Sequence, residues 1–300
     1  MKTEVSRMAV ASRSKQRVIL NLFTYVNLRF QDDTLFCGSF MFVLLSMLLA
    51  VSACGPGAAS EGKEEVVVFA AASLRDVLEE IGDQFEAETG VSVLFNFAGS
   101  NVLAQQIVAT PGADLFLSAS ARWMDTVEEA NRLTAETRHA LISNSLALIA
   151  HPNTTFTLAD PCELASFDFK YLALGNPDAV PAGRYARTWL TTQTCGEGTL
   201  WEALEARVAP APDVRSALGL VVADPGLLGI VYKTDWMAFA EEARLLYEVP
   251  RETAPPIRYD LAQVAGGPNP TGAVRLHAYL RGSAARPIFE RHGFRMLPES

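Results

Sequence analysis

The chain has 300 residues, of which 49% are apolar and 20% are charged, and its formal net charge is −9. This composition is ordinary for a globular protein, and the length predicts two domains. The negative charge offers no electrostatic footprint for nucleic acid, so we expect no nucleic-acid partner.

The N-terminal segment is predicted to be a targeting signal. Residues 40–53 carry no charge, and this run is short for a membrane span but typical of the apolar region of a signal peptide. It ends in Val51-Ser52-Ala53-Cys54, which resembles the lipobox of bacterial lipoproteins. We therefore predict a lipoprotein signal peptide over 1–53, lipidation of Cys54 and a small, polar tether over 54–65. A cleaved signal without a lipid and an uncleaved anchor are the alternatives.

Cysteine usage fits an exported protein. Beyond Cys37 and Cys54 of the leader, only Cys162 and Cys195 remain, with no histidine or cysteine at metal-ligand spacing. In an oxidising compartment these two can form a disulfide, which would close a loop of about 34 residues and stabilise the fold by roughly 3–4 kcal/mol. Two unpaired buried thiols are the alternative.

The first mature element is a strand that leads into a helix. Residues 65–70 are continuously apolar after Glu65, which is typical of a strand buried on both faces. The apolar residues of 77–85 then recur with helical spacing, and Gly90 ends that helix. Ser73 stands at the N-cap position with Asp76 three residues later, as in a capping box. A helix N-terminus binds anions readily, although Ser73 could serve only as a cap.

This strand–helix pattern recurs along the first half of the chain. A strand over 91–97 meets a turn at 98–101, and Ser100 precedes the next helix, 102–109. A strand over 113–118 and a helix over 123–130 follow. Strands that alternate with helices indicate βαβ units and a parallel sheet with helices on both faces.

The second half contains two further helix starts rich in small residues, and we expect a second domain from about residue 144. Ala182-Gly183 precedes one helix, and Pro212-Asp213 precedes another whose apolar face begins at Val214. A short strand over 228–232 ends in the hydroxyl of Tyr232. The remaining expected strands are 145–150, 171–174, 245–249 and 258–264, and the remaining helices are 271–281 and 284–292.

Several common catalytic and cofactor motifs are missing from the sequence. It has no phosphate-binding loop pattern, no GxGxxG motif and no GxSxG nucleophile elbow. The four histidines are scattered and lie away from the four helix starts. We therefore expect neither an enzyme nor a cofactor.

The motifs, taken in order, resemble one family: the periplasmic molybdate-binding proteins of ABC transporters. The resemblance runs from about Val66 to Phe294. The matching segments are residues 69–74, 113–119, 123–125, 144–146, 175–177, 180–183, 213–215 and 229–232.

The resemblance implies a type II periplasmic-binding-protein fold, in which two α/β lobes close over a ligand cleft. It assigns residues 66–144 plus 255–300 to lobe I and 145–254 to lobe II. It also implies that a tetrahedral oxyanion is held without any cationic side chain. Ser73 and Ser100 would donate from hydroxyl and backbone groups, Ala182 and Val214 from backbone N–H groups, and Tyr232 from its phenol. These residues would contact the oxyanion of molybdate rather than coordinate a metal ion directly.

The implied function is capture of molybdate and tungstate outside the cytoplasm and delivery to the permease of an ABC importer. The protein would be a monomer on the periplasmic side, anchored in the membrane by its lipid, or soluble there if it is not lipidated. Three alternatives stay open: a receptor for sulfate or phosphate, a hydrolase with Ser73 as nucleophile, and a surface lipoprotein without a transport role.

Overall fold

A computed structural model describes residues 64–298. The predicted signal peptide 1–53, the lipidation site Cys54 and residues 54–63 of the predicted tether lie outside these residues. The predicted tether 54–65 and the predicted strand 65–70 overlap at Glu65, and the structure places Glu65 as the first residue of the strand. No helix within 64–298 is both long and apolar enough to cross a membrane.

The first sheet has six strands in the order β13-β4-β12-β3-β1-β2. These strands are β1 (Glu65–Ala71), β2 (Ser92–Ala98), β3 (Leu115–Ser118), β4 (His139–Ser143), β12 (Tyr259–Gln263) and β13 (Arg295–Met296). The helices that accompany them are η1 (Ala72–Leu74, a 3₁₀ turn), α3 (Arg75–Thr89), α4 (Ser100–Ala109), α5 (Ala121–Glu129), α10 (Pro270–Arg281) and α11 (Arg286–Arg291). Helix α3 buries Val77, Leu78, Ile81 and Phe85, the apolar face that the sequence predicts.

The second sheet has five strands in the order β11-β5-β10-β6-β9. These strands are β5 (Leu146–Ala150), β6 (Tyr171–Gly175), β9 (Val208–Ala211), β10 (Leu227–Tyr232) and β11 (Arg244–Glu248). Its helices are η2 (Pro161–Ala165), α6 (Pro181–Thr192), α7 (Leu200–Leu204), η3 (Glu205–Arg207), α8 (Val214–Ala223) and α9 (Lys233–Ala238), and a small hairpin joins β7 (Thr194–Cys195) to β8 (Gly198–Thr199). Strands β5 and β10 are buried along their whole length and form the centre of this half of the core.

The α/β class is confirmed, and the strands predicted over 65–70, 91–97 and 113–118 pair in parallel, although both sheets also contain antiparallel strands. Strands β2, β1 and β3 are parallel, as are β10, β6 and β9. Strand β12 runs antiparallel to β3 and β4, and β5 runs antiparallel to β10 and β11. Strands β12 and β5 each follow a passage of the chain between the two sheets, and β13 also runs antiparallel to its neighbour β4.

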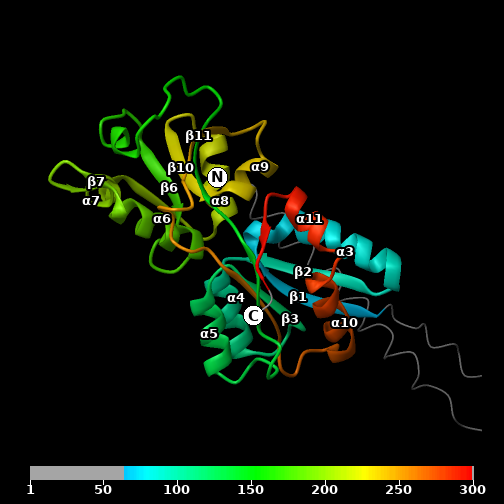
Figure 1. The fold of residues 1–300 in the computed structure, drawn as a ribbon. Helices are drawn as coiled ribbons and strands as arrows, with labels where there is room; N and C mark the ends of the chain where they lie inside the picture. The colour runs from blue at the N-terminus through cyan, green and yellow to red at the C-terminus, as the bar shows by residue number, and fades with distance from the viewer. Residues whose placement is uncertain (1–63, 299–300) are drawn as a thin grey trace, which may run out of the picture. The chain divides into compact units, whose positions relative to one another are not determined.

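The chain passes between the two sheets twice (Figure 1). It leaves the first sheet after β4 and enters the second at β5, with Asn144 and Ser145 between them. It returns from β11 to β12 through residues 249–258. Each sheet is thus built from sequence segments that only these two passages connect.

A disulfide joins Cys162 to Cys195, whose Cα atoms lie 5.4 Å apart. It ties η2 to the β7–β8 hairpin and lies entirely within the second-sheet half. The two sulfur atoms are bonded to each other. Residues 64–298 hold no group of three or more histidine, cysteine, aspartate or glutamate side chains arranged to bind a metal ion.

Candidate functional site

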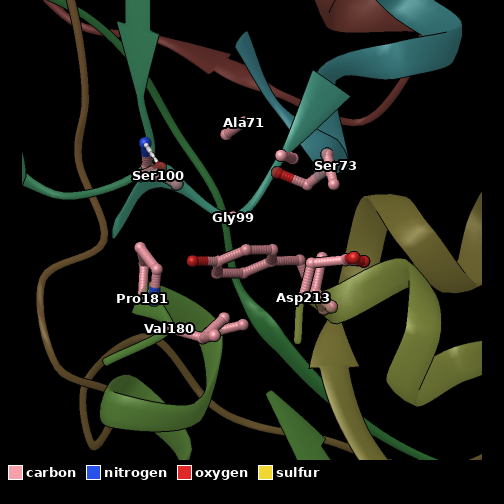
Figure 2. Close-up of a pocket in the computed structure, with 13 residues that line it drawn as sticks. Ala71, Ser73, Gly99, Ser100, Val180, Pro181 and Asp213 are labelled. Carbon is pink, nitrogen blue, oxygen red and sulfur yellow. Dashed lines mark hydrogen bonds between the residues drawn. The ribbon is translucent and has the colours of Figure 1, made fainter. Parts of the chain in front are cut away.

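One pocket is lined by strand ends and helix starts that belong to both the first-sheet half and the second-sheet half (Figure 2). It contains about 210 Å³ of space between its atoms, part of which opens to solvent. The lining residues from the first-sheet half are Ala71, Ala72, Ser73, Ala98, Gly99, Ser100 and Ala119. Those from the second-sheet half are Val180, Pro181, Ala182, Asp213, Val214 and Tyr232. Figure 2 shows Ser73 and Ser100 facing Val180, Pro181 and Asp213 across this space.

All five residues that the resemblance nominates lie in this lining: Ser73, Ser100, Ala182, Val214 and Tyr232. They come from five elements spread over 160 positions of sequence, between residues 73 and 232. The fold therefore brings them together around one small volume.

Ser73 does not cap a helix, so the predicted capping box is wrong. Ser73 lies inside the 3₁₀ turn η1, and helix α3 begins only at Arg75, with Leu74 as its N-cap and no side-chain cap bond. The Ser73 hydroxyl instead shares a hydrogen bond of 3.0 Å with the phenol oxygen of Tyr259 on β12. Both side chains are buried. The extra 3₁₀ turn moves Ser73 away from the cap position, which leaves its hydroxyl free for another role.

Ser100 is the first residue of α4 and is almost completely buried. Its Oγ accepts a hydrogen bond of 3.0 Å from the backbone N–H of Ala119, drawn as a dashed line in Figure 2. The hydroxyl therefore still has its own hydrogen to donate. The neighbouring Asn101 does not line the pocket, and its buried Oδ1 has no hydrogen-bond partner among the described residues.

Helices α6 and α8 present their first turns to the pocket. The first N–H groups of a helix have no partner within it, and they carry the positive end of the helix dipole. Pro181 begins α6 but has no N–H, so Ala182 is the first N–H donor of that helix. Asp213 caps α8: its carboxylate accepts from the backbone N–H of Ser216 at 2.9 Å and from the Ser216 hydroxyl at 2.9 Å. Val214, the first residue of α8, keeps its own N–H outside this cap.

Tyr232 ends β10 and is 1% exposed, yet its phenol oxygen has no hydrogen-bond partner among the described residues. Burial raises the pKa of this phenol well above its usual value, and the neighbouring phenols of Tyr259 and Tyr185 add to the effect. The Tyr259 phenol also interacts with the Tyr232 hydroxyl as a hydrogen-bonding group, although the two do not form a hydrogen bond of ordinary length and angle. The group therefore stays protonated and can act as a donor. An unpaired buried hydroxyl costs about 1–3 kcal/mol, so its position in the pocket lining suits it to donate to a bound ligand.

The pocket lining contains no lysine, arginine or histidine. The cation next to it in sequence, Arg215, is engaged elsewhere: it forms ion pairs with Asp76 and, at 2.6 Å, with Asp235. The only charged side chain in the lining is Asp213, whose two oxygens are both occupied by the cap. The pocket thus offers neutral donors and helix N-termini, a combination suited to an anion.

Two groups next to the site were not predicted from the sequence. Tyr259 and Asn144 stand behind Ser73 and form hydrogen bonds in series with it. They lie 186 and 71 positions from Ser73, and no local spacing signals a contact of that kind.

Comparison with known proteins finds one matching family and several relatives. Residues 66–295 match the family described as bacterial extracellular solute-binding protein. The molybdate-binding protein ModA of Escherichia coli K12 is 38% identical over 250 residues, which cover 82% of this chain and 94% of that protein.

Two solved structures support the fold. The periplasmic molybdate-binding protein of Azotobacter vinelandii has a TM-score of 0.67 at 21% identity, covering 78% of this chain and 99% of that chain. The sulfate-binding protein SubI of Mycobacterium tuberculosis has a TM-score of 0.69 at 15% identity, covering 78% of this chain and 87% of that chain. At these identities the likeness concerns the fold alone.

Proposed function

This chain belongs to the bacterial extracellular solute-binding protein family, and we propose that it captures molybdate and tungstate for the permease of an ABC importer. The family consists of binding proteins rather than enzymes, and the ligand is a transported solute rather than a cofactor. The name of the 38% identical relative supports the choice of molybdate. The family also indicates a location outside the cytoplasm, on the periplasmic side.

The unpartnered hydroxyl of Tyr232 is the observation that carries this proposal. Its oxygen is buried in the pocket lining and forms no hydrogen bond of ordinary length and angle among the described residues. A tetrahedral oxyanion would accept from it, from the hydroxyls of Ser73 and Ser100, and from the first N–H groups of α6 and α8. Charge-assisted hydrogen bonds of this kind contribute about 1.5–3 kcal/mol each.

Neutral donors also select the charge state of the ligand. Every group that we assign to the site is a donor, so an anion oxygen that carried a hydrogen would meet another hydrogen. A fully ionised dianion such as molybdate or tungstate avoids this conflict. Selection against the smaller sulfate ion would depend on the size of the pocket, because sulfate could not reach all of the donors at once.

The two sheets and the two passages between them support a two-lobed receptor that closes on its ligand. We assign residues 66–144 plus 255–300 to lobe I and residues 145–254 to lobe II. Two contacts would hold the closed form. The indole N–H of Trp123 on α5 donates to the carbonyl oxygen of Ala179 at 2.9 Å, and Arg215 on α8 pairs with Asp76 on α3. Closure of this kind would create the surface that the permease recognises.

The anchor is a separate part of the proposal. The lipobox-like segment that ends in Cys54 supports a lipidated mature N-terminus joined to the folded part by a short tether. The lipid would keep the receptor, as a monomer, close to its permease.

A Tyr232→Phe variant tests the role of the unpartnered hydroxyl. The substitution removes one oxygen and keeps the ring, so we expect molybdate binding measured by calorimetry to weaken about tenfold or more. The ligand-free variant should be at least as stable as the wild type, because the lost hydroxyl has no partner to leave behind.

A matched control is Tyr279→Phe on α10, where the phenol bonds to Glu88 and lies outside the pocket lining. We expect its molybdate affinity to equal that of the wild type. Unchanged affinity in Tyr232→Phe would contradict the assignment of this hydroxyl to the site, and binding of sulfate or phosphate in preference to molybdate would change the substrate.

A further inference from the structure

Behind Ser73 lies a row of buried polar side chains that the pocket lining does not include. Asn144 stands in the first passage between the sheets, and Tyr259 begins β12 directly after the second. The Tyr259 phenol oxygen lies 3.0 Å from Ser73 Oγ and 3.2 Å from Asn144 Nδ2. Asn144, Tyr259 and Ser73 are 8%, 1% and 3% exposed, so water does not compete for these bonds.

The hydrogen bonds of Asn144 fix the direction of this row. The backbone N–H of Ser145 donates to Asn144 Oδ1 at 2.8 Å, so the amide NH₂ is the group that faces Thr234 and Tyr259. One of its hydrogens goes to Thr234 Oγ1 at 2.8 Å, and the other goes to the phenol oxygen of Tyr259.

The Tyr259 hydroxyl lies between Asn144 and Ser73 and connects their hydrogen bonds. Burial raises the pKa of the phenol far above its usual value, so the group keeps its single hydrogen. The phenol oxygen accepts from Asn144, and the bond between Tyr259 and Ser73 can run in either direction; we take the direction in which the phenol hydrogen points to Ser73 Oγ. The oxygen of Ser73 then accepts one hydrogen bond, and its own hydrogen is left for the pocket.

We propose that Asn144 and Tyr259 are positioning residues that hold the Ser73 hydroxyl as a donor toward the bound anion. The inference rests on the proposed function, since it assumes an anion in the pocket. A serine hydroxyl can present either its hydrogen or a lone pair, and only the hydrogen attracts an anion. The hydrogen bonds from Asn144 through Tyr259 to Ser73, which we call the relay, orient the serine hydroxyl before the ligand binds. A binding group oriented in advance is preorganised.

A double-mutant cycle measures this coupling. Molybdate is titrated by calorimetry into the wild type, Tyr259→Phe, Ser73→Ala and the double variant. We expect Tyr259→Phe to weaken binding about 3- to 10-fold in the wild-type background and by less than about twofold in the Ser73→Ala background. A purely structural role of Tyr259 would weaken binding by the same factor in both backgrounds, and that result would overturn the relay.

Asn144→Asp gives a second test that does not depend on the folding of Tyr259→Phe. A carboxylate only accepts, so Tyr259 would donate to residue 144 and Ser73 would donate to Tyr259, which reverses the relay. We expect a greater loss of affinity than in Tyr259→Phe, and part of this loss should vanish in the Ser73→Ala background. The part that persists there measures the added negative charge. If the whole loss persists, the direction of the relay has no effect and the proposal is wrong.

The outcomes for the wild type separate this inference from the proposed function. Molybdate binding with uncoupled substitutions would overturn the relay and leave the receptor function intact. Absence of molybdate binding by the folded wild type would overturn the proposed function and the relay with it. Tyr279→Phe serves as the control for loss of a phenol outside the site.

Discussion

At the scale of single residues, the pocket combines hydroxyl groups in different states. Ser100 accepts a hydrogen bond from a backbone N–H and has its own hydrogen left to donate. Ser73 shares a hydrogen bond with the phenol of Tyr259, and in the relay that we propose it accepts this bond and also keeps its hydrogen for the pocket. Tyr232 forms no hydrogen bond of ordinary length and angle among the described residues, although its hydroxyl interacts with the phenol of Tyr259. All three groups are thus available as donors, and none of them needs a cation beside it.

Asp235 is a buried carboxylate close to this region. It is fully buried on α9 and pairs with Arg215 at 2.6 Å, and Arg215 also pairs with Asp76. Burial raises the pKa of Asp235 from 3.8 to about 6, although Arg215 acts in the opposite direction. Between about pH 4 and pH 6 the folded protein therefore holds a proton that the unfolded chain has released.

This raised pKa predicts a pH dependence of stability. The stability that Asp235 contributes is complete below about pH 4 and is lost as the pH rises through about 6. The Asp235→Asn variant has no titrating group at this position. The pH dependence that comes from all other groups cancels when the stabilities of the two proteins are compared. Urea unfolding of both proteins from pH 4 to pH 8 should show the wild type losing stability relative to the variant up to about pH 6.5, with no further change above. Parallel pH profiles for the two proteins would show that burial does not raise this pKa.

Sequence information reached only part of the site. The five nominated residues lie at helix starts and at a strand end, which are positions that sequence patterns can identify. The family resemblance then selected these five as ligand contacts. Ser73 was assigned to the wrong local structure, because a 3₁₀ turn between strand and helix leaves no distinct pattern. Tyr259 and Asn144 were not predicted, since only the folded sheets bring them to Ser73.

At the scale of elements, the position of α6 depends on close packing against β6. A Cβ added at Gly183 would lie 1.7 Å from the carbonyl oxygen of Gly175, so the first turn of α6 touches the backbone at the end of β6. This contact fixes the place of Ala182, the first N–H donor of the helix. Glycine is required here by space rather than by backbone angle.

Substitution of this glycine should therefore affect both stability and binding. Gly183→Ala would force α6 away from β6, and we expect a lower melting temperature and molybdate affinity reduced about tenfold or more. Gly219→Ala in α8 is the matched control, because a Cβ there meets nothing within 4 Å. It should raise stability by up to about 1 kcal/mol and leave affinity unchanged. If Gly183→Ala bound molybdate with wild-type affinity, the start of α6 would not contribute to the binding site.

Most periodic elements were predicted well, whereas β4, β9 and α9 were missed. The observed positions agree with the predicted ones to within a few residues for the strands β1 and β10 and for the helices α3, α6, α8 and α10. Strand β9 contains Pro210, which argues against a strand, and helix α9 is only six residues long. Strand β4 is separated from β5 by two residues, so the apolar pattern does not reveal that the two strands belong to different sheets.

At the scale of the whole described structure, two mixed sheets and two chain passages arrange four helix starts around one pocket. The composition of each sheet follows from the passages, which insert antiparallel strands beside parallel ones. The family resemblance implied an α/β fold of two lobes. The alternation of strands and helices indicated the parallel strands β1, β2 and β3, but it did not indicate the antiparallel strands beside them. The order of strands within a sheet is set by long-range pairing, which the sequence patterns do not encode.

The most direct test of the account is thermal unfolding of the purified protein with molybdate, tungstate, sulfate and phosphate in turn. A ligand at a hundred times its dissociation constant adds about 2.7 kcal/mol to stability, which raises the melting temperature by several degrees. The account predicts such a rise with molybdate and tungstate and none with sulfate or phosphate. A rise with sulfate or phosphate alone, or no rise with any of the four, would contradict it.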